Sequence, residues 1–417
     1  MKKILCLLLC LVMMTGVSGF ASAVFEEAAI VEIDGEEYIP LEDLQSYFRE
    51  RFGSAGETIV LKGAQLLDSS FDGEVCDVLI QDGYILALGQ DLTGDTVVDL
   101  TGYTLMPGMI DAHVHIASSS DYGIDRLAQF CEQGITSVRE EGMLSTGGEM
   151  EFLALIEQAN EDPANAYLVS CGKYLDVTGG YGMGPTGNMG IVITNADEAA
   201  AEIEYKAELG YHQVKVGINS DTDRMTAEEF TAIIDTAHAN DMPVAAHVNY
   251  AKHLEELVGY GIDEAAHTPS DEMSAALIDD MVERGVAMNT SGAENYEDIK
   301  IANLKAFYEA GGFITVGTDL MRGYDTAMES LVSEMAVLAK AGLTVQEVIA
   351  CATHNNAAAL GIVDTGDIMV GMQADLIAVK GTVDETFAAL EDVAFVMNNG
   401  VVLVSPSETV PETSSEP

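Results

Sequence analysis

From Tyr103 onward, short apolar runs alternate with longer amphipathic stretches, and this rhythm limits the folds open to the chain. Amphipathic stretches of helical spacing separate the runs, and several begin with a capping pattern, namely Thr194 with Asp197, Thr226 with Glu229 and Thr344 with Glu347. The eight apolar runs of strand character are Thr104–Ile110, Thr136–Val138, Ala166–Val169, Gln213–Val216, Val244–Ala246, Glu264–Ala266, Val286–Met288 and Phe313–Val316. Such repeats predict an α/β fold, a (β/α)8 TIM-like barrel over residues 106–361. Strand counting alone leaves an open, doubly wound sheet as the alternative.

Short β-like runs flank this region on both sides. They fill residues 57–105, and they return after Gly361 as Ala374–Val379 and Val393–Val404. We therefore predict a small β-sandwich domain whose two parts are residues 57–105 and 362–404. Residues 24–56 form an acidic N-terminal appendage, and residues 405–417, rich in Ser, Glu, Thr and Pro, predict a disordered tail.

The first residues have the pattern of a targeting signal. Lys2 and Lys3 precede the unbroken apolar run Ile4–Met14, and Ala21-Ser22-Ala23 provides a small-x-small cleavage site. We predict a signal peptide over residues 1–23 and a secreted or extracytoplasmic mature protein. A lipid-anchored cysteine is the alternative, although Cys6 and Cys10 lack small residues just before them.

Charge and cysteine spacing exclude several classes of protein. The chain has 18 Lys+Arg against 69 Asp+Glu, a formal net charge of −51, so it offers no basic surface for nucleic acid. No apolar run after the signal is long enough to span a membrane. The remaining cysteines are spaced unlike a zinc site or a disulfide scaffold, and we expect buried thiols at Cys76, Cys131, Cys171 and Cys351.

Metal-ligating residue types follow the predicted strands. His113 and His115 share one face at the end of the first strand, because side chains two residues apart in a strand point the same way. His247 and His267 end the fifth and sixth strands, and Asp319 follows the eighth. Lys215 lies within the fourth strand, where an unpaired charge would be costly. These strand ends predict one site at the mouth of the barrel.

At this point the chain resembles the amidohydrolase superfamily of metal-dependent hydrolases. It is most similar to the branch of imidazolonepropionase-like proteins and metal-dependent prolidases, which cut dipeptides. The matching segments, which span roughly residues 57–404, are PGMIDAHVH (107–115), VKVG (214–217), AAHV (245–248), AAHT (265–268), GTD (317–319), ATHNNAAALG (352–361) and GMQADLIAV (371–379).

The resemblance implies a site with two divalent metal ions, which are usually zinc in that family. It implies that His113, His115 and Asp319 hold one ion and that His247 and His267 hold the other. Lys215 would carry a CO2-derived carbamate that bridges both. Two such ions convert water to a hydroxide nucleophile near neutral pH, and Asp319 is placed to move its proton to the leaving amine. The implied reaction is hydrolysis of an amide C–N bond.

The substrate is less constrained than the chemistry. Thr178-Gly179-Gly180-Tyr181-Gly182 resembles the TGGHG loop of the prolidase-like branch, with Tyr181 in place of a His that can contact substrate. Three basic residues lie just past strand ends, Arg139, Lys173 and Arg322, and one could anchor a substrate carboxylate. We expect a small peptide or N-acyl amino acid as substrate, and a homo-oligomer is left open.

Two rival functions remain at this stage. The first is a mononuclear relative that opens a cyclic amide or deaminates a ring, which needs no carboxylated Lys215. The second is a catalytically silent protein that uses the barrel to capture metal or solute. Metal stoichiometry and turnover separate these rivals from the two-metal hydrolase.

Overall fold

A computed structural model describes residues 31–33, 36–38, 56–119, 123–145, 147–181, 190–291 and 298–406. The predicted signal peptide and nearly all of the predicted tail lie outside these residues, as does most of the N-terminal appendage. Within the appendage, strands β1 (Val31–Ile33) and β2 (Glu36–Tyr38) pair antiparallel. The described residues divide into two compact units: the first draws its residues from 1–108, 363–383 and 392–417, and the second from 109–362 and 384–391.

The first unit is built on one mixed sheet to which both flanks of the chain contribute. Its strands are β3 (Thr58–Leu67), β4 (Asp72–Gln81), β5 (Tyr84–Gly89), β6 (Thr96–Asp99), β7 (Tyr103–Pro107), β20 (Leu376–Lys380), β21 (Val393–Asn398) and β22 (Val401–Val404). They pair in the order β22-β21-β20-β7-β3-β4-β5. The long strand β3 also pairs with β6 through residues 59–62, whereas β7 pairs with its residues 65 and 66.

The core of this sheet joins early and late segments of the chain. Val60, Leu61 and Leu105 from the early strands are fully buried with Leu376 and Phe395 from the late ones. Because apolar side chains gain roughly 25 cal/mol per Å2 when they leave water, this shared core holds the two sequence segments in one sheet.

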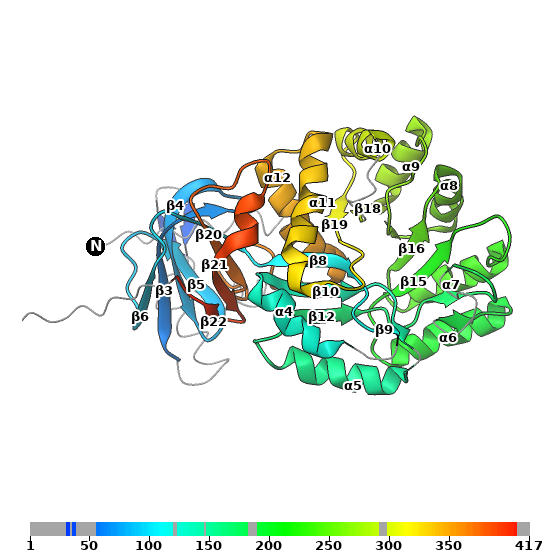
Figure 1. Ribbon diagram of the computed structural model, residues 1–417, viewed down its shortest axis with the longest axis horizontal. Helices are drawn as coiled ribbons and strands as arrows, with labels where there is room; N and C mark the ends of the chain where they lie inside the picture. The colour runs from blue at the N-terminus through cyan, green and yellow to red at the C-terminus, as the bar shows by residue number, and fades with distance from the viewer. Residues whose placement is uncertain are drawn as a thin grey trace, which may run out of the picture. The chain divides into compact units, whose positions relative to one another are not determined.

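The second unit includes two short parallel pairs, β9 (Ser118–Ser119) with β11 (Leu144–Ser145) and β13 (Leu175–Asp176) with β14 (Ile191–Val192). Its two larger sheets contain eight parallel strands, and Figure 1 shows helices on the outside of them. The strands are β8 (Met109–Val114), β10 (Ile135–Glu140), β12 (Tyr167–Ser170), β15 (Val214–Ile218), β16 (Val244–Val248), β17 (Glu264–Ala265), β18 (Ala287–Thr290) and β19 (Ile314–Val316). They pair as a three-stranded sheet, β12-β10-β8, and a five-stranded sheet, β15-β16-β17-β18-β19. A parallel bridge between Val114 and Leu320 links the end of β8 to the residues that follow β19.

The helices of this unit follow the strands in sequence. They are α4 (Leu127–Glu132), α5 (Glu149–Asn160), α6 (Ala196–Glu208), α7 (Ala227–Ala239), α8 (Ala251–Tyr260), α9 (Ala275–Arg284), α10 (Asp298–Glu309), α11 (Ala327–Ala341), α12 (Val345–Ala350) and α13 (Asn356–Leu360). Every residue of β15 and β16 is buried, as expected for parallel strands with both faces covered. The chemistry-bearing positions on these strands are therefore shielded from bulk water.

The predicted helix caps and cysteine states are only partly confirmed by the structure. The capping boxes at Thr226 and Thr344 are confirmed, since each side chain bonds the backbone of the Glu three residues later and the reverse bond is present. The prediction at Thr194 is wrong by one residue, because Asn195 has extended backbone and accepts the hydrogen bond from the Glu198 N–H. The four described cysteines are free thiols; Cys131, Cys171 and Cys351 are buried, as predicted, but Cys76 is only half-buried.

The first predicted strand, Thr104–Ile110, is wrong in its bounds. The chain leaves β7 at Gly108 and starts β8 at Met109, so the run divides between the two units. In the described segments, no helix is long and apolar enough to cross a membrane.

Candidate metal centre

The end of β8 places His113 and His115 beside the turn that carries Asp319. The Asp319 N–H donates to the His113 carbonyl at 2.7 Å, and the His115 N–H donates to the Leu320 carbonyl at 2.8 Å. Both imidazoles are buried. The period-two spacing of a strand thus puts two ring nitrogens next to one carboxylate.

The Asp319 carboxylate faces these two rings. Its Oδ1 lies 3.2 Å from His115 Nε2 and 3.5 Å from His113 Nε2. Burial alone would raise the pKa of Asp319, but the hydrogen bond and the charge of His115 oppose it, and the pKa is lowered. An ionised carboxylate with buried imidazoles is a ligand set that suits a divalent cation.

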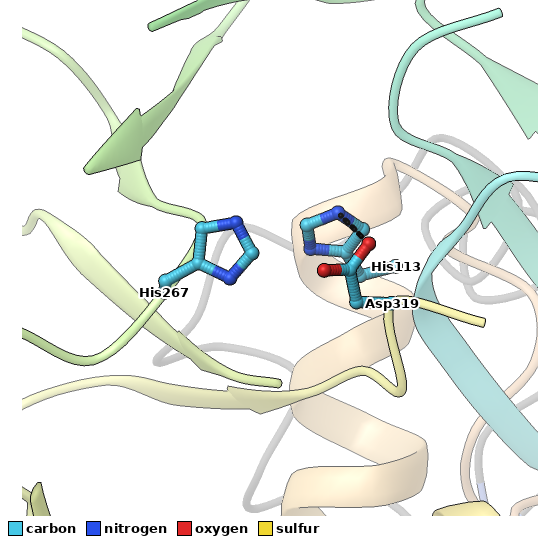
Figure 2. A group of neighbouring side chains, drawn as sticks. All are labelled: His113, His267 and Asp319. Atoms are coloured by element: carbon cyan, nitrogen blue, oxygen red, sulfur yellow. Dashed lines mark ion pairs between the residues drawn. The ribbon is translucent and has the colours of Figure 1, made fainter. Parts of the chain in front are cut away.

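Two further imidazoles close the group. The ring centroids of His113 and His267 lie 5.1 Å apart, and those of His247 and His267 lie 4.4 Å apart. One ligand atom from each of His113, His267 and Asp319 falls within 4.8 Å of the other two. Figure 2 shows His267 facing His113 and Asp319 from the other side of the group.

The hydrogen bonds of the rings leave nitrogen lone pairs available. The Gly142 carbonyl takes the Nδ1–H of His115 at 2.9 Å. The Ser291 hydroxyl donates to the Ala266 carbonyl at 3.1 Å, so it accepts from His267 Nδ1, which leaves Nε2 of that ring as an acceptor. Outer partners of this kind fix the tautomer of metal-binding histidines.

Other ring nitrogens in the group are orphaned. Among the described residues, Nδ1 of His113 and Nδ1 of His247 are buried without a hydrogen-bond partner. Burial lowers the pKa of His113, His247 and His267, so these rings are neutral, the form that binds metal. Buried polar atoms are normally paired, and a cation bound at either nitrogen would satisfy it.

His115 shows the same preference for a positive charge in another way. Burial lowers its pKa, but hydrogen bonds with Asp319 and Glu140 more than compensate and raise it to about 10. Nε2 of this ring faces the Asp319 carboxylate at a buried place that favours a positive charge, so the residues fit a metal ion.

Lys215 lies on β15 and is buried, but its immediate partner is a carboxylate rather than an imidazole. Its Nζ donates to Glu141 Oε2 in a buried ion pair. Glu141 directly follows β10, so this pair connects residues far apart in the sequence. No local sequence pattern reports a contact between different strands, so this pair was not predicted.

Arg139 is placed in the chain's own polar network and does not offer its guanidinium to a ligand. Its Nε donates to the Ala112 carbonyl at 2.7 Å and pairs with Glu141 at 2.8 Å. Its two terminal nitrogens bind the Glu264 carboxylate, with one distance of 3.1 Å. The guanidinium is buried and fully occupied, so Arg139 is not retained as a substrate anchor.

The other predicted substrate contacts lie nearer the solvent. The Tyr181 ring stacks on the His247 ring with centroids 3.4 Å apart and an interplanar angle of 13°, and Tyr181 is 37% exposed. Arg322 is exposed on the segment that follows Asp319, and Lys173 is half-buried after β12. Tyr181 and Arg322 therefore remain available to a bound substrate.

Asp111 is a functional residue that the sequence analysis missed. Its buried carboxylate accepts from the Thr318 N–H at 3.0 Å, the Thr318 hydroxyl at 2.6 Å and the His113 N–H at 3.1 Å. It thereby ties the turn that carries Asp319 to the strand that carries His113. Its signal was its position two residues before His113, on the same face of the strand.

Comparison with known proteins decides the family. A model of the amidohydrolase family matches residues 104–404. The chain belongs to this family. The resemblance seen in its motifs is thus confirmed, and the chain is a hydrolase of a family that acts on carbon–nitrogen bonds. Amidohydrolases usually bind metal, in agreement with the cluster of His113, His267 and Asp319.

Curated relatives are similar over most of the chain. A 5-methylthioadenosine/S-adenosylhomocysteine deaminase of Halobacterium salinarum is 25% identical over 370 residues, which cover 78% of this chain and 84% of that protein. An imidazolonepropionase of Deinococcus deserti is 24% identical over 351 residues, which cover 73% of this chain and 85% of that protein.

Solved structures share the fold at lower sequence identity. A Xaa-Pro dipeptidase with bound methionine has a TM-score of 0.71 at 20% identity and covers 84% of this chain and 100% of that one. A putative prolidase from Bifidobacterium longum has a TM-score of 0.70 at 22% identity, covering 84% and 96%. At sequence identities this low, the likeness shows that the amidohydrolase chain shares its fold with these enzymes and shows nothing more.

Proposed function

We propose that this amidohydrolase uses two metal ions to cleave the amide C–N bond of a small peptide or N-acyl amino acid. The observation that carries the proposal is the convergence of His113, His267 and Asp319, with buried, orphaned nitrogens on His113 and His247. Support for the substrate class comes from structures of the same fold, which include a Xaa-Pro dipeptidase and a prolidase complexed with N-methylphosphonate-L-proline.

The proposal assigns His113, His115 and Asp319 to one ion, and His247 and His267 to the other. Lys215, carboxylated by CO2, would supply the oxygen ligand common to both. Imidazole and carboxylate ligands suit zinc, which we propose as the metal. When bound, the ions would polarise the scissile carbonyl and lower the pKa of water.

The chain's own residues would bind the substrate and move the proton. Asp319, ionised beside His115, would accept a proton from water and deliver it to the leaving amine. Tyr181, stacked on His247 and partly exposed, would contact the substrate, and the exposed Arg322 would pair with a substrate carboxylate. Each of these groups follows or lies on a strand end of the second unit.

A closed barrel and export from the cytoplasm are also part of the proposal. We propose that the eight parallel strands form the wall of one barrel, with the site at their carboxyl ends. The bridge from Val114 to Leu320 supports this closure between β8 and β19. The basic, apolar and small-residue pattern of residues 1–23 supports export of the mature protein.

Metal content is the first test. Mature protein purified with zinc and bicarbonate should contain two ions per chain by elemental analysis, and it should hydrolyse members of a dipeptide and N-acyl amino acid panel. Asp319→Asn should lower kcat by about a hundredfold or more, because general acid–base groups contribute about 10²–10⁴-fold. Asp325→Asn, at an exposed position on the same segment, is the matched control and should leave kcat unchanged. Two bound ions without turnover of any amide would contradict the hydrolase and leave a metal-binding protein.

A mononuclear hydrolase or deaminase is the second candidate. The buried pair of Lys215 with Glu141 favours it, because Lys215 already has a counter-ion without a carbamate. The relatives named deaminase and imidazolonepropionase point in the same direction. One ion per chain, together with turnover of cyclic amides or amino-substituted rings, would establish this alternative.

A further inference from the structure

Glu141 holds the side chain of Lys215 from a different strand. Glu141 directly follows β10 of the three-stranded sheet, whereas Lys215 lies on β15 of the five-stranded sheet. Both side chains are buried, and Glu141 Oε2 accepts a hydrogen bond from Lys215 Nζ. The carboxylate therefore fixes the direction in which the lysine nitrogen presents its hydrogens.

The Glu141 carboxylate is itself held rigidly. Its Oε1 pairs with Arg139 Nε at 2.8 Å and accepts from Gln213 Nε2 at 3.4 Å. Arg139 is in turn bound by Glu264 and by the Ala112 carbonyl. Because one oxygen is committed to the guanidinium, the other has a fixed position beside Lys215.

Carboxylation changes what Lys215 can donate. In the reaction, the lone pair of the neutral amine bonds to the carbon of CO2, one C=O pair moves to oxygen, and one N–H proton leaves to solvent. The product, –NH–CO2⁻, keeps a single N–H on a planar nitrogen. The position of an acceptor for that N–H then sets the rotation of the carbamate.

We propose that Glu141 is the positioning residue of the Lys215 carbamate: its Oε2 accepts the remaining N–H, which turns the carbamate oxygens away from Glu141 and toward the histidine cluster. The inference rests on the proposed two-metal function. Lys215 lies beside this cluster, because β15 pairs in parallel with β16 in the register Lys215 with Ala245 and Gly217 with His247. In the loaded site two cations would neutralise the negative charge of the carbamate oxygens. The carbamate N–H is then the group that donates to the Glu141 carboxylate.

The test follows the carbamate and the metal, not turnover alone. Wild type, Glu141→Gln and Glu141→Ala are loaded with zinc over a series of 13C-bicarbonate concentrations. The carbamate carbon is measured by NMR and the zinc by elemental analysis. Both variants should need roughly ten- to a hundredfold more bicarbonate for half-occupancy, the equivalent of one charged hydrogen bond. In Glu141→Gln, the amide oxygen accepts from Arg139, so the amide NH2 group faces Lys215. Two hydrogen-bond donors, the amide N–H and the carbamate N–H, then oppose each other.

Glu264→Gln is the matched control. It removes a buried charge from the same arginine, yet Glu264 makes no hydrogen bond to Lys215 in the described chain. Its bicarbonate requirement should change by less than about threefold, below one neutral hydrogen bond. An equal shift in Glu264→Gln would assign the effect to the network as a whole and overturn the role of Glu141.

The remaining outcomes separate this inference from the function on which it rests. Retention of one zinc ion per chain shows that a variant is folded. If Glu141→Ala does not fold, the result for Glu141→Gln alone tests the inference. Unchanged carbamate occupancy in that variant, with wild type carboxylated and holding two ions, overturns the inference and leaves the function standing. A wild type with one ion and no carbamate overturns both.

Discussion

Asp319 is held in an unusual backbone conformation at the residue where its carboxylate is needed. Its φ is +57°, in the left-handed region that most side chains avoid and that Asp tolerates better than most. The hydrogen bonds from Thr318 to Asp111 and from the Asp319 N–H to His113 hold the turn in place. Local strain of this kind persists only where surrounding contacts over-determine it, and it concentrates at functional sites.

Asp176 provides a residue-scale prediction about pH. It is buried on β13 (Leu175–Asp176), its Oδ1 accepts from the Val177 N–H at 2.8 Å, and its Oδ2 is unpaired in the described chain. Burial raises its pKa to about 7. The folded state therefore binds a proton that the unfolded state, with a pKa near 4, has released. Stability from this group is complete below about pH 4 and is lost as pH rises toward and past 7.

Asp176→Asn should remove this loss. The free energy of unfolding of the variant should exceed that of wild type by about 2–4 kcal/mol at pH 8 and should match it near pH 4. Urea unfolding at a series of pH values measures both. Asp325→Asn, at an exposed position, should show no such pH-dependent gain. An Asp176→Asn curve parallel to wild type would show that this carboxyl does not titrate on unfolding.

At the scale of elements, the sequence predicts what is local and misses what is not. Period-two spacing placed His113 and His115 on one face, and strand-end positions brought His267 and Asp319 to the same cluster. The break at Gly108 escaped notice, since an apolar run does not show that its two halves join different sheets. The pair of Lys215 with Glu141 escaped for the same reason, because pairing across strands depends on the tertiary fold.

Helix α7 gives the prediction at this scale. Thr226 caps it, with the hydroxyl accepting from the Glu229 N–H at 3.3 Å and the Glu229 side chain accepting from the Thr226 N–H at 2.7 Å. Thr226→Ala should lower the free energy of unfolding by roughly 1 kcal/mol, because a backbone donor loses its partner. Thr226→Ser keeps the hydroxyl and is the control. The free energy of unfolding is measured by calorimetry or urea unfolding. If Thr226→Ser loses as much stability as Thr226→Ala, the hydroxyl does not stabilise the start of the helix.

The whole molecule carries far more negative than positive charge, and the sequence establishes this without the fold. The formal net charge of −51 is spread over a chain whose described acidic side chains are mostly exposed. Such a surface keeps molecules apart in solution, but its self-repulsion opposes the compact state. The repulsion weakens as salt shortens the distance over which charges act, from about 30 Å at 0.01 M to about 3 Å at 1 M.

Thermal stability should therefore rise with salt. Between about 0.01 M and about 1 M NaCl we expect Tm to increase by several degrees, with most of the gain in the lower part of the range where screening changes fastest. Exposed ion pairs such as Lys305 with Glu309 are weakened by the same salt, but such pairs contribute only about 0–1 kcal/mol each. Scanning calorimetry with sucrose as the control separates screening from preferential exclusion, which stabilises without adding ions. A Tm that falls with NaCl would mean that the favourable pairs outweigh the repulsion of the net charge.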